Sequence, residues 1–148
     1  MQKIILVFII FLNLIEFSYS KDEYFRTLRN DKVNLRQGPS FEYPIKILYK
    51  KKFLPVIVQE SSDNFRKIRD HENNSGWIHI SQLSKKKAAI VINNEEIIFK
   101  NPTIYSKAIV ILKKGRLVKV KKCKKIWCKI TSSKYKGWIK RDSLWGLL

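Results

Sequence analysis

The chain has 148 residues and a mass of 17.6 kDa, which suits one ordinary domain or two very small ones. A hydrophobic content of 45% argues against a disordered chain, and two Cys and five Gly exclude a zinc-cluster domain, a disulfide-dense miniprotein and a collagen-like chain. The net charge of +19 permits an acidic partner without identifying one.

The first twenty residues have the pattern of an export signal. Lys3 precedes an apolar run over 4–15, which is shorter than the roughly 20 residues that cross a membrane, and small residues follow at Ser18 and Ser20. We predict a signal peptide over 1–20, cleaved after Ser20; the alternative is an uncleaved membrane anchor. The mature protein, 21–148, is then periplasmic or secreted, and we expect no membrane span in it.

Short strands separated by turns are predicted after an N-terminal lead over 21–29. Val33–Arg36 alternates apolar and polar residues before a Gly-Pro turn. Further strands are predicted at 53–58, 65–69 and 77–80, and the apolar run 88–92 closes the first unit. No helical periodicity lasts for two turns, so an all-β sandwich or small barrel is expected.

The mature chain repeats itself with an offset of 61–63 residues. Gly76-Trp77-Ile78 matches Gly137-Trp138-Ile139, Phe65–Ile68 matches Trp127–Ile130, and Pro39 matches Pro102. Offsets that drift by single residues are typical of short loop deletions. We therefore predict two tandem domains, at 30–92 and 93–148, with the boundary at Asn93-Asn94.

The order of these segments resembles the bacterial SH3-like (SH3b) family. Val33-Asn34-Leu35-Arg36-Gln37-Gly38-Pro39 is similar to the opening of such domains, and a basic turn, a Val-x-Val strand, an aromatic-x-Lys strand and Gly76-Trp77-Ile78 follow in family order. The end of the chain, from Trp138 to Gly146, is similar to secreted tandem SH3-like proteins of Gram-negative bacteria. The second copy departs from the pattern at Phe99–Pro102. The resemblance implies two tandem SH3-like β-barrels.

The same resemblance implies a ligand groove, because SH3-like domains often bind peptides or cell-wall peptide stems at the rim of their first loop. Ile104 lies at this rim in the second copy, and the aromatic candidates are Phe41, Tyr43, Tyr49, Trp77, Tyr105 and Trp138. Each group of residues also has a structural alternative to ligand contact. Tyr43 and Tyr105 would simply cover a small core. Trp77 and Trp138 would fill the core, while the Gly before each of them allows a tight turn.

Cys123 and Cys128 flank a short turn, and an exported protein meets oxidising conditions, so we predict that they form a disulfide. Catalysis is not expected, because neither Cys has a neighbouring His and no phosphate-binding loop or serine-hydrolase motif is present. His71 and His79 lack the spacing of metal ligands and are expected on the surface. We expect no metal and no cofactor.

Positive charge concentrates in the second half. Residues 21–83 carry 12 basic and 8 acidic side chains, whereas 84–148 carry 18 and 3. One hairpin supplies a candidate basic face, formed by Lys113, Lys114, Arg116, Lys119, Lys121, Lys122, Lys124 and Lys125. Such a face could dock an anionic envelope polymer or lipid headgroup. The alternative is that these lysines reflect an AT-rich genome and keep a β surface soluble.

Two functions follow from these observations. The first is a non-enzymatic binding module that recognises peptidoglycan peptide or an envelope protein. The second is a structural or assembly accessory of the envelope that acts through the basic face. Nucleic acid is not an expected partner of an exported protein.

Overall fold

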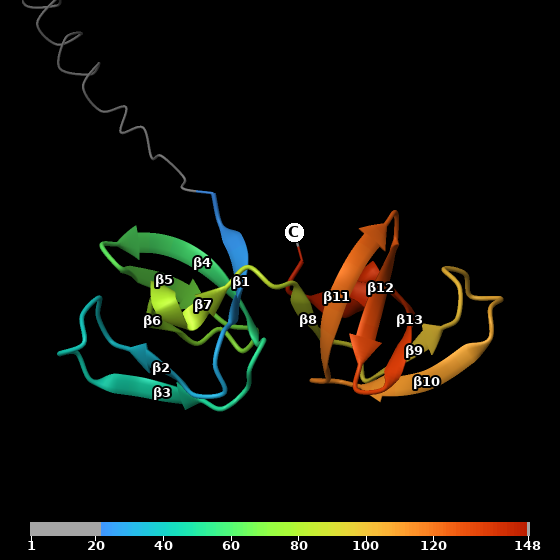
Figure 1. Cartoon of the computed structure of the whole chain (residues 1–148), viewed down its shortest axis with the longest axis horizontal. Helices are drawn as coiled ribbons and strands as arrows, with labels where there is room; N and C mark the ends of the chain where they lie inside the picture. Colours follow the sequence, from blue (N-terminus) through green and yellow to red (C-terminus); the bar gives the residue numbers. More distant parts are fainter. Residues whose placement is uncertain (1–21, 148) are drawn as a thin grey trace, which may run out of the picture.

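The computed structural model describes residues 22–147, so the signal-peptide prediction lies outside the described residues. The regular secondary structure of these residues consists of strands and two short 3-10 helices (η), joined by turns and loops (Figure 1). The first half contains β1 (Tyr24–Leu28), β2 (Val33–Arg36), β3 (Ile45–Tyr49), β4 (Pro55–Ser62), β5 (Phe65–Arg69), β6 (Ser75–His79), η1 (Ile80–Gln82) and β7 (Leu83–Ser84). The second contains β8 (Ala88–Val91), β9 (Glu95–Phe99), β10 (Ala108–Lys113), β11 (Leu117–Lys124), β12 (Trp127–Ser132), β13 (Tyr135–Lys140), η2 (Arg141–Ser143) and β14 (Leu144–Trp145).

The two halves have the same topology. The first sheet has the order β3-β2-β6-β5-β4-β1-β7, and the second has β10-β9-β13-β12-β11-β8-β14, which is the same order shifted by seven strands. The predicted all-β duplication is therefore confirmed. Because β3 and β7 end the first sheet without pairing to each other, and β10 and β14 end the second, neither barrel is fully closed.

The domain limits differ from those predicted. The expected lead, 21–29, contains β1, which pairs with β4 and β7 inside the first sheet. Residues 88–92 were expected to close the first unit, but β8 pairs with β11 and β14 and opens the second. All four residues of β8 are buried, so no alternation of apolar and polar residues indicates which sheet it joins.

Strand β8 also joins the two domains. Ala89 and Val91 belong to the core of the second domain, whereas Ile90 lies in the core cluster of the first. Successive side chains of a strand point to opposite faces, so one short strand contributes to both interiors. Phe25 and Trp145 add an edge-to-face contact across the junction, with ring centroids 5.1 Å apart. The domains therefore pack against each other side by side (Figure 1).

The Gly-Trp pairs do not have the core-filling role that the sequence left open as an alternative. Trp77 and Trp138 lie half-buried on the outer faces, while the following Ile78 and Ile139 are fully buried. Neither Gly has a positive φ. Instead, a Cβ on Gly76 would lie 2.7 Å from a backbone oxygen of β2, and one on its counterpart in β13 would lie 2.4 Å from a methyl carbon of β9. These glycines allow two strands to approach closely.

Candidate functional site

The loop between β2 and β3 folds over the outer face of β5 and β6. Phe41 lies in this loop with 62% of its surface exposed, and its ring centroid is 5.2 Å from that of Phe65 and 5.1 Å from that of His79. Phe65 and His79 are opposite each other in the β5–β6 register, and their rings are 5.1 Å apart. The three rings form a cluster in which a solvent-facing ring is held against two others.

Arg36 fixes the backbone of this loop. Its Nη1 donates hydrogen bonds to the carbonyl oxygens of Phe41, at 2.9 Å, and Tyr43, at 2.8 Å. Its Cζ also lies 5.5 Å from the centroid of the Phe41 ring. The amide of Gln37 donates to the carbonyl of Pro44 and closes the base of the loop. The exposed rings are thus positioned before any ligand arrives, which lowers the entropy lost on binding.

Tyr43 is 47% exposed and its ring lies against the backbone of Gly38. A Cβ at Gly38 would lie 2.6 Å from three atoms of that ring, so this packing requires glycine. In the second domain both positions change together. Asn101 replaces the glycine, Ser106 replaces the tyrosine, and the amide of Asn101 donates to the Ser106 hydroxyl at 2.9 Å.

Trp77 extends the cluster along the sheet. It lies opposite Arg36 on β2 and Lys67 on β5, so these side chains share the outer face. We call the following residues the aromatic surface: Arg36, Phe41, Tyr43, Phe65, Trp77 and His79. The sequence prediction includes Phe41, Tyr43 and Trp77 but misses the other three. The one signal for His79 is its spacing of two residues from Trp77, which places both on one face of a strand.

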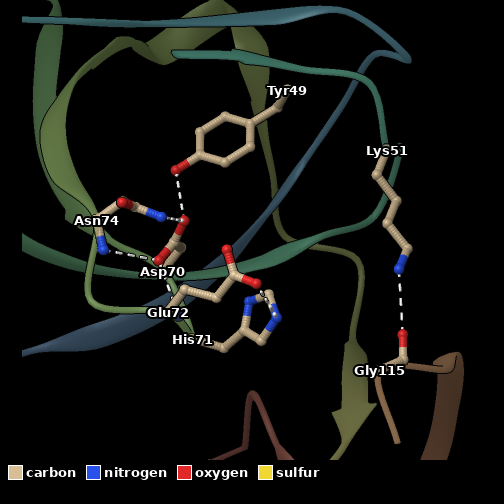
Figure 2. A network of polar contacts seen from close by, with 7 residues as sticks. All are labelled: Tyr49, Lys51, Asp70, His71, Glu72, Asn74 and Gly115. Carbon is tan, nitrogen blue, oxygen red and sulfur yellow. Dashed lines mark hydrogen bonds and ion pairs between the residues drawn. The ribbon is translucent and has the colours of Figure 1, made fainter. Parts of the chain in front are cut away.

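Tyr49 does not belong to this surface, which corrects its assignment to the groove. It is buried, and its hydroxyl donates to Asp70 Oδ2 at 2.8 Å (Figure 2). The Asp70 carboxylate also accepts from the side chain of Asn74 and from the amides of Glu72 and Asn74, each at 2.9 Å. Burial opposes ionisation of Asp70, but these four donors outweigh it and lower the pKa of the carboxyl group. Burial, followed by the bond to Asp70, raises the pKa of Tyr49.

The second domain presents a different surface. Tyr105 is 92% exposed and Ile104 is 54% exposed, both in the loop between β9 and β10. Trp138 is half-buried, with Lys129 Nζ 6.0 Å from its ring centroid. Phe99 takes the place of the loop-fixing arginine of the first domain. The loops of the two domains lie at opposite ends of the molecule (Figure 1), so the candidate groove residues form two separate groups.

The candidate basic residues of the hairpin are all exposed, but they do not share one face. Lys114 and Arg116 lie before β11, whereas Lys124 and Lys125 lie at its far end, about 25 Å away for a strand of this length. A bulge after Val120 interrupts the alternation between these ends. The remaining four differ in their surroundings. Lys113 pairs with Glu95, Lys119 lies over the Phe53 ring, Lys121 lies in the bulge, and Lys122 lines a cleft between the domains.

The predicted disulfide is present. Cys123 and Cys128 are directly opposite in the β11–β12 register, their Cα atoms are 4.0 Å apart, and a bond joins their sulfurs. Cys128 is fully buried in the second core, whereas Cys123 is exposed. The bond therefore ties the tip of the hairpin to the interior of the second domain.

Within residues 22–147, no three side chains of the metal-binding types His, Cys, Asp and Glu gather into a group that could hold a metal ion. His79 packs in the aromatic surface, and His71 lies 3.9 Å from the carboxylate of Glu72. In the same part of the chain no helix has the length and apolar character that a bilayer crossing requires.

Comparison with protein families matches the bacterial SH3 domain twice, at residues 29–85 and 93–146. The first match spans β2 to β7 and the second spans β9 to β14, so β1 and β8 lie outside both matches. None of the curated proteins matches the chain.

Solved structures with a similar course of the chain include NlpC2 and NlpC1 from Trichomonas vaginalis and an NlpC/P60 family protein from Bacillus cereus. The identities are 16%, 15% and 10%, and the TM-scores are 0.39, 0.38 and 0.38. The matches cover 86%, 86% and 82% of this chain but 49%, 47% and 55% of the others. This chain thus spans about half the length of those proteins.

Proposed function

Because the chain belongs to the bacterial SH3 domain family, whose members are typically binding modules, we propose that it is an exported, non-enzymatic binding protein. Its ligand is a peptide of the cell wall or of an envelope protein, held on the aromatic surface of the first domain. The observation that carries this proposal is the exposed Phe41 ring, which Arg36, Phe65 and His79 hold in place.

The chemistry of the aromatic surface suits an extended peptide. Rings fixed in the free protein supply apolar contact area with little loss of freedom on binding, and such residues dominate the affinity of many interfaces. Two nitrogens of the Arg36 guanidinium remain beyond the one that holds the loop, and they can donate to a peptide carbonyl or carboxylate. The second domain lacks the fixing arginine, so we assign the main contact to the first domain.

Binding to purified peptidoglycan, at low and at high salt, tests this assignment. We expect wild-type protein to be retained at both salt concentrations, because contacts between apolar groups are not screened by ions. Phe41→Ala removes the outer ring, and we expect it to weaken retention by about tenfold or more. Ile126→Ala is the matched control, because Ile126 is 67% exposed and lies on the hairpin of the other domain. Tyr105→Ala tests the loop of the second domain.

The outcomes separate the possible ligands. Equal losses in the Phe41 and Ile126 variants, or retention that disappears with salt, would contradict a role for the aromatic surface. If wild-type protein is not retained at all, the cell-wall peptide is excluded. Cross-linking in native envelope then tests the protein partner, and Phe41→Ala must reduce that cross-link for the proposal to stand.

Export is tested separately by sequencing the N-terminus of the protein isolated from its native location. We expect the mature chain to begin at Lys21, and an N-terminus that still contains the apolar run over 4–15 would contradict cleavage.

A further inference from the structure

A cleft of about 350 Å³ lies between the two domains, away from the aromatic surface. Strand β1 forms one wall, β11 forms the other, and the linker from β7 to β8 and the end of the chain complete it. Figure 1 shows these segments meeting at the centre of the molecule. Its basic lining residues, which we call the basic cleft, are Arg26, Lys85, Lys86, Lys87, Lys122 and Arg141.

In the part of the chain that the structure describes, no Asp or Glu side chain lines this cavity. Within residues 22–147, none of the six cations takes part in an ion pair, whereas Lys67 and Lys113 elsewhere each pair with a glutamate. Arg26 donates one hydrogen bond to the carbonyl of Phe25, and its Cζ lies 4.4 Å from the centroid of the Tyr24 ring. The ammonium of Lys86 lies 5.5 Å from the centroid of the Phe53 ring. Neither ring neutralises the charge. Six like charges around one cavity repel one another, and an anion would relieve that repulsion.

The backbone of the lysine linker is held in place by both domains. The buried hydroxyl of Thr27, on β1, donates to the carbonyl of Lys86 at 2.8 Å. The amide of Val120, on β11, donates to the carbonyl of Lys87 at 3.0 Å. The amide of Lys86 donates to the Ser84 hydroxyl. A run of lysines in a free linker would spread into solvent, but here the positions of their Cα atoms are fixed beside the cavity.

The size of the cavity indicates what kind of anion it suits. A volume of about 350 Å³ is at the lower end of small-molecule sites and is too small for a folded polymer. A single carboxylate would leave most of the six charges unneutralised. Arginine and lysine together are typical of phosphate sites, where the guanidinium donates to two oxygens and the ammonium supplies charge. Phe25, Val120 and Leu147 add an apolar part to the lining.

We propose that the basic cleft binds a compact ligand that carries two or more negative charges on phosphate groups. The source of such a ligand is either a free phosphate compound or the headgroup of a phospholipid. This site shares no residue with the aromatic surface, so it is independent of the proposed peptide binding.

Titration calorimetry of the whole protein with pyrophosphate tests the site, and flotation with vesicles of phosphatidylglycerol in phosphatidylcholine tests the lipid source. The cleft variant combines Lys87→Gln, Lys122→Gln and Arg141→Gln. The control variant combines Lys100→Gln, Lys107→Gln and Lys136→Gln, three exposed lysines of the second domain that do not line the cavity. Both variants lose three positive charges, so net charge is matched between them.

We expect pyrophosphate to bind wild type with a stoichiometry of one, and the cleft variant to bind at least about tenfold more weakly. The control variant should stay within about twofold of wild type, because distant exposed charges are screened. Binding of vesicles but not of pyrophosphate, lost only in the cleft variant, assigns the lipid headgroup. Equal weakening in both variants, or binding of neither probe by wild type, overturns the proposal. Thermal unfolding of both variants checks that they are folded. If the triple cleft variant does not fold, the same binding comparison is made with the single variant Lys122→Glu.

Discussion

Replacing Tyr49 with Phe isolates one bond of the Asp70 network. The substitution removes only the hydroxyl group that donates to Asp70 Oδ2 at 2.8 Å, while the ring still fills its buried site. A hydrogen bond to a charged group contributes about 1.5–3 kcal/mol. Asp70 keeps its three other donors, and its side chain is 1% exposed, so water cannot easily replace the lost one. We therefore expect Tyr49→Phe to lower the free energy of unfolding by about 2 kcal/mol at pH 7.

The effect must depend on pH in a defined direction. The pKa of Asp70 is lower in the folded protein than its unfolded value of about 3.9. The ionised carboxylate therefore stabilises the fold fully above about pH 4, and this stability is lost as the pH falls through the folded pKa. The difference between wild type and Tyr49→Phe should accordingly shrink towards pH 2, when Asp70 becomes protonated.

Urea unfolding of both proteins between pH 2 and pH 7 measures this difference. In an Asp70→Asn background the same hydroxyl no longer meets a charge, so Tyr49→Phe should have a smaller effect that does not change with pH. A loss below about 0.5 kcal/mol at pH 7, or a loss that is equal at both ends of the pH range, would refute the assignment of this bond.

Three further predictions concern the fold. Gly137→Ala should destabilise the second domain by about 1–3 kcal/mol in urea unfolding, because its Cβ would lie 2.4 Å from the Ile98 side chain. Ile90→Ala should lower the free energy of unfolding by about 2–5 kcal/mol, because this β8 residue belongs to the first domain's core. In calorimetry it should turn a single unfolding transition into two. One unchanged transition would show that Ile90 does not couple the domains. Reduction of the Cys123–Cys128 bond should lower stability by about 2 kcal/mol, because it closes a short loop, and thiol labelling before reduction should find no free cysteine.

Much of this protein follows from its sequence because the decisive signals are local. The repeated Gly-Trp-Ile segments and the matching strands predict a duplicated β domain. The alternation of apolar and polar residues that indicates a strand can be recognised within a few consecutive residues. Cys123 and Cys128 are five residues apart across a turn, so their pairing also needs little knowledge of the rest of the chain. The two matches to the bacterial SH3 family span these same segments.

The tertiary structure decided where each strand pairs and which side chains meet. Strand β8 has four buried residues and no alternation, so only its hydrogen-bonded partners place it in the second sheet. Tyr43 lies exposed in a loop, whereas Tyr49, at the end of β3, is buried and donates to a carboxylate that is 21 residues away in the chain. The six cations of the basic cleft come from four distant segments. Contacts between residues far apart in the chain depend on register and domain packing, which no short stretch of sequence encodes.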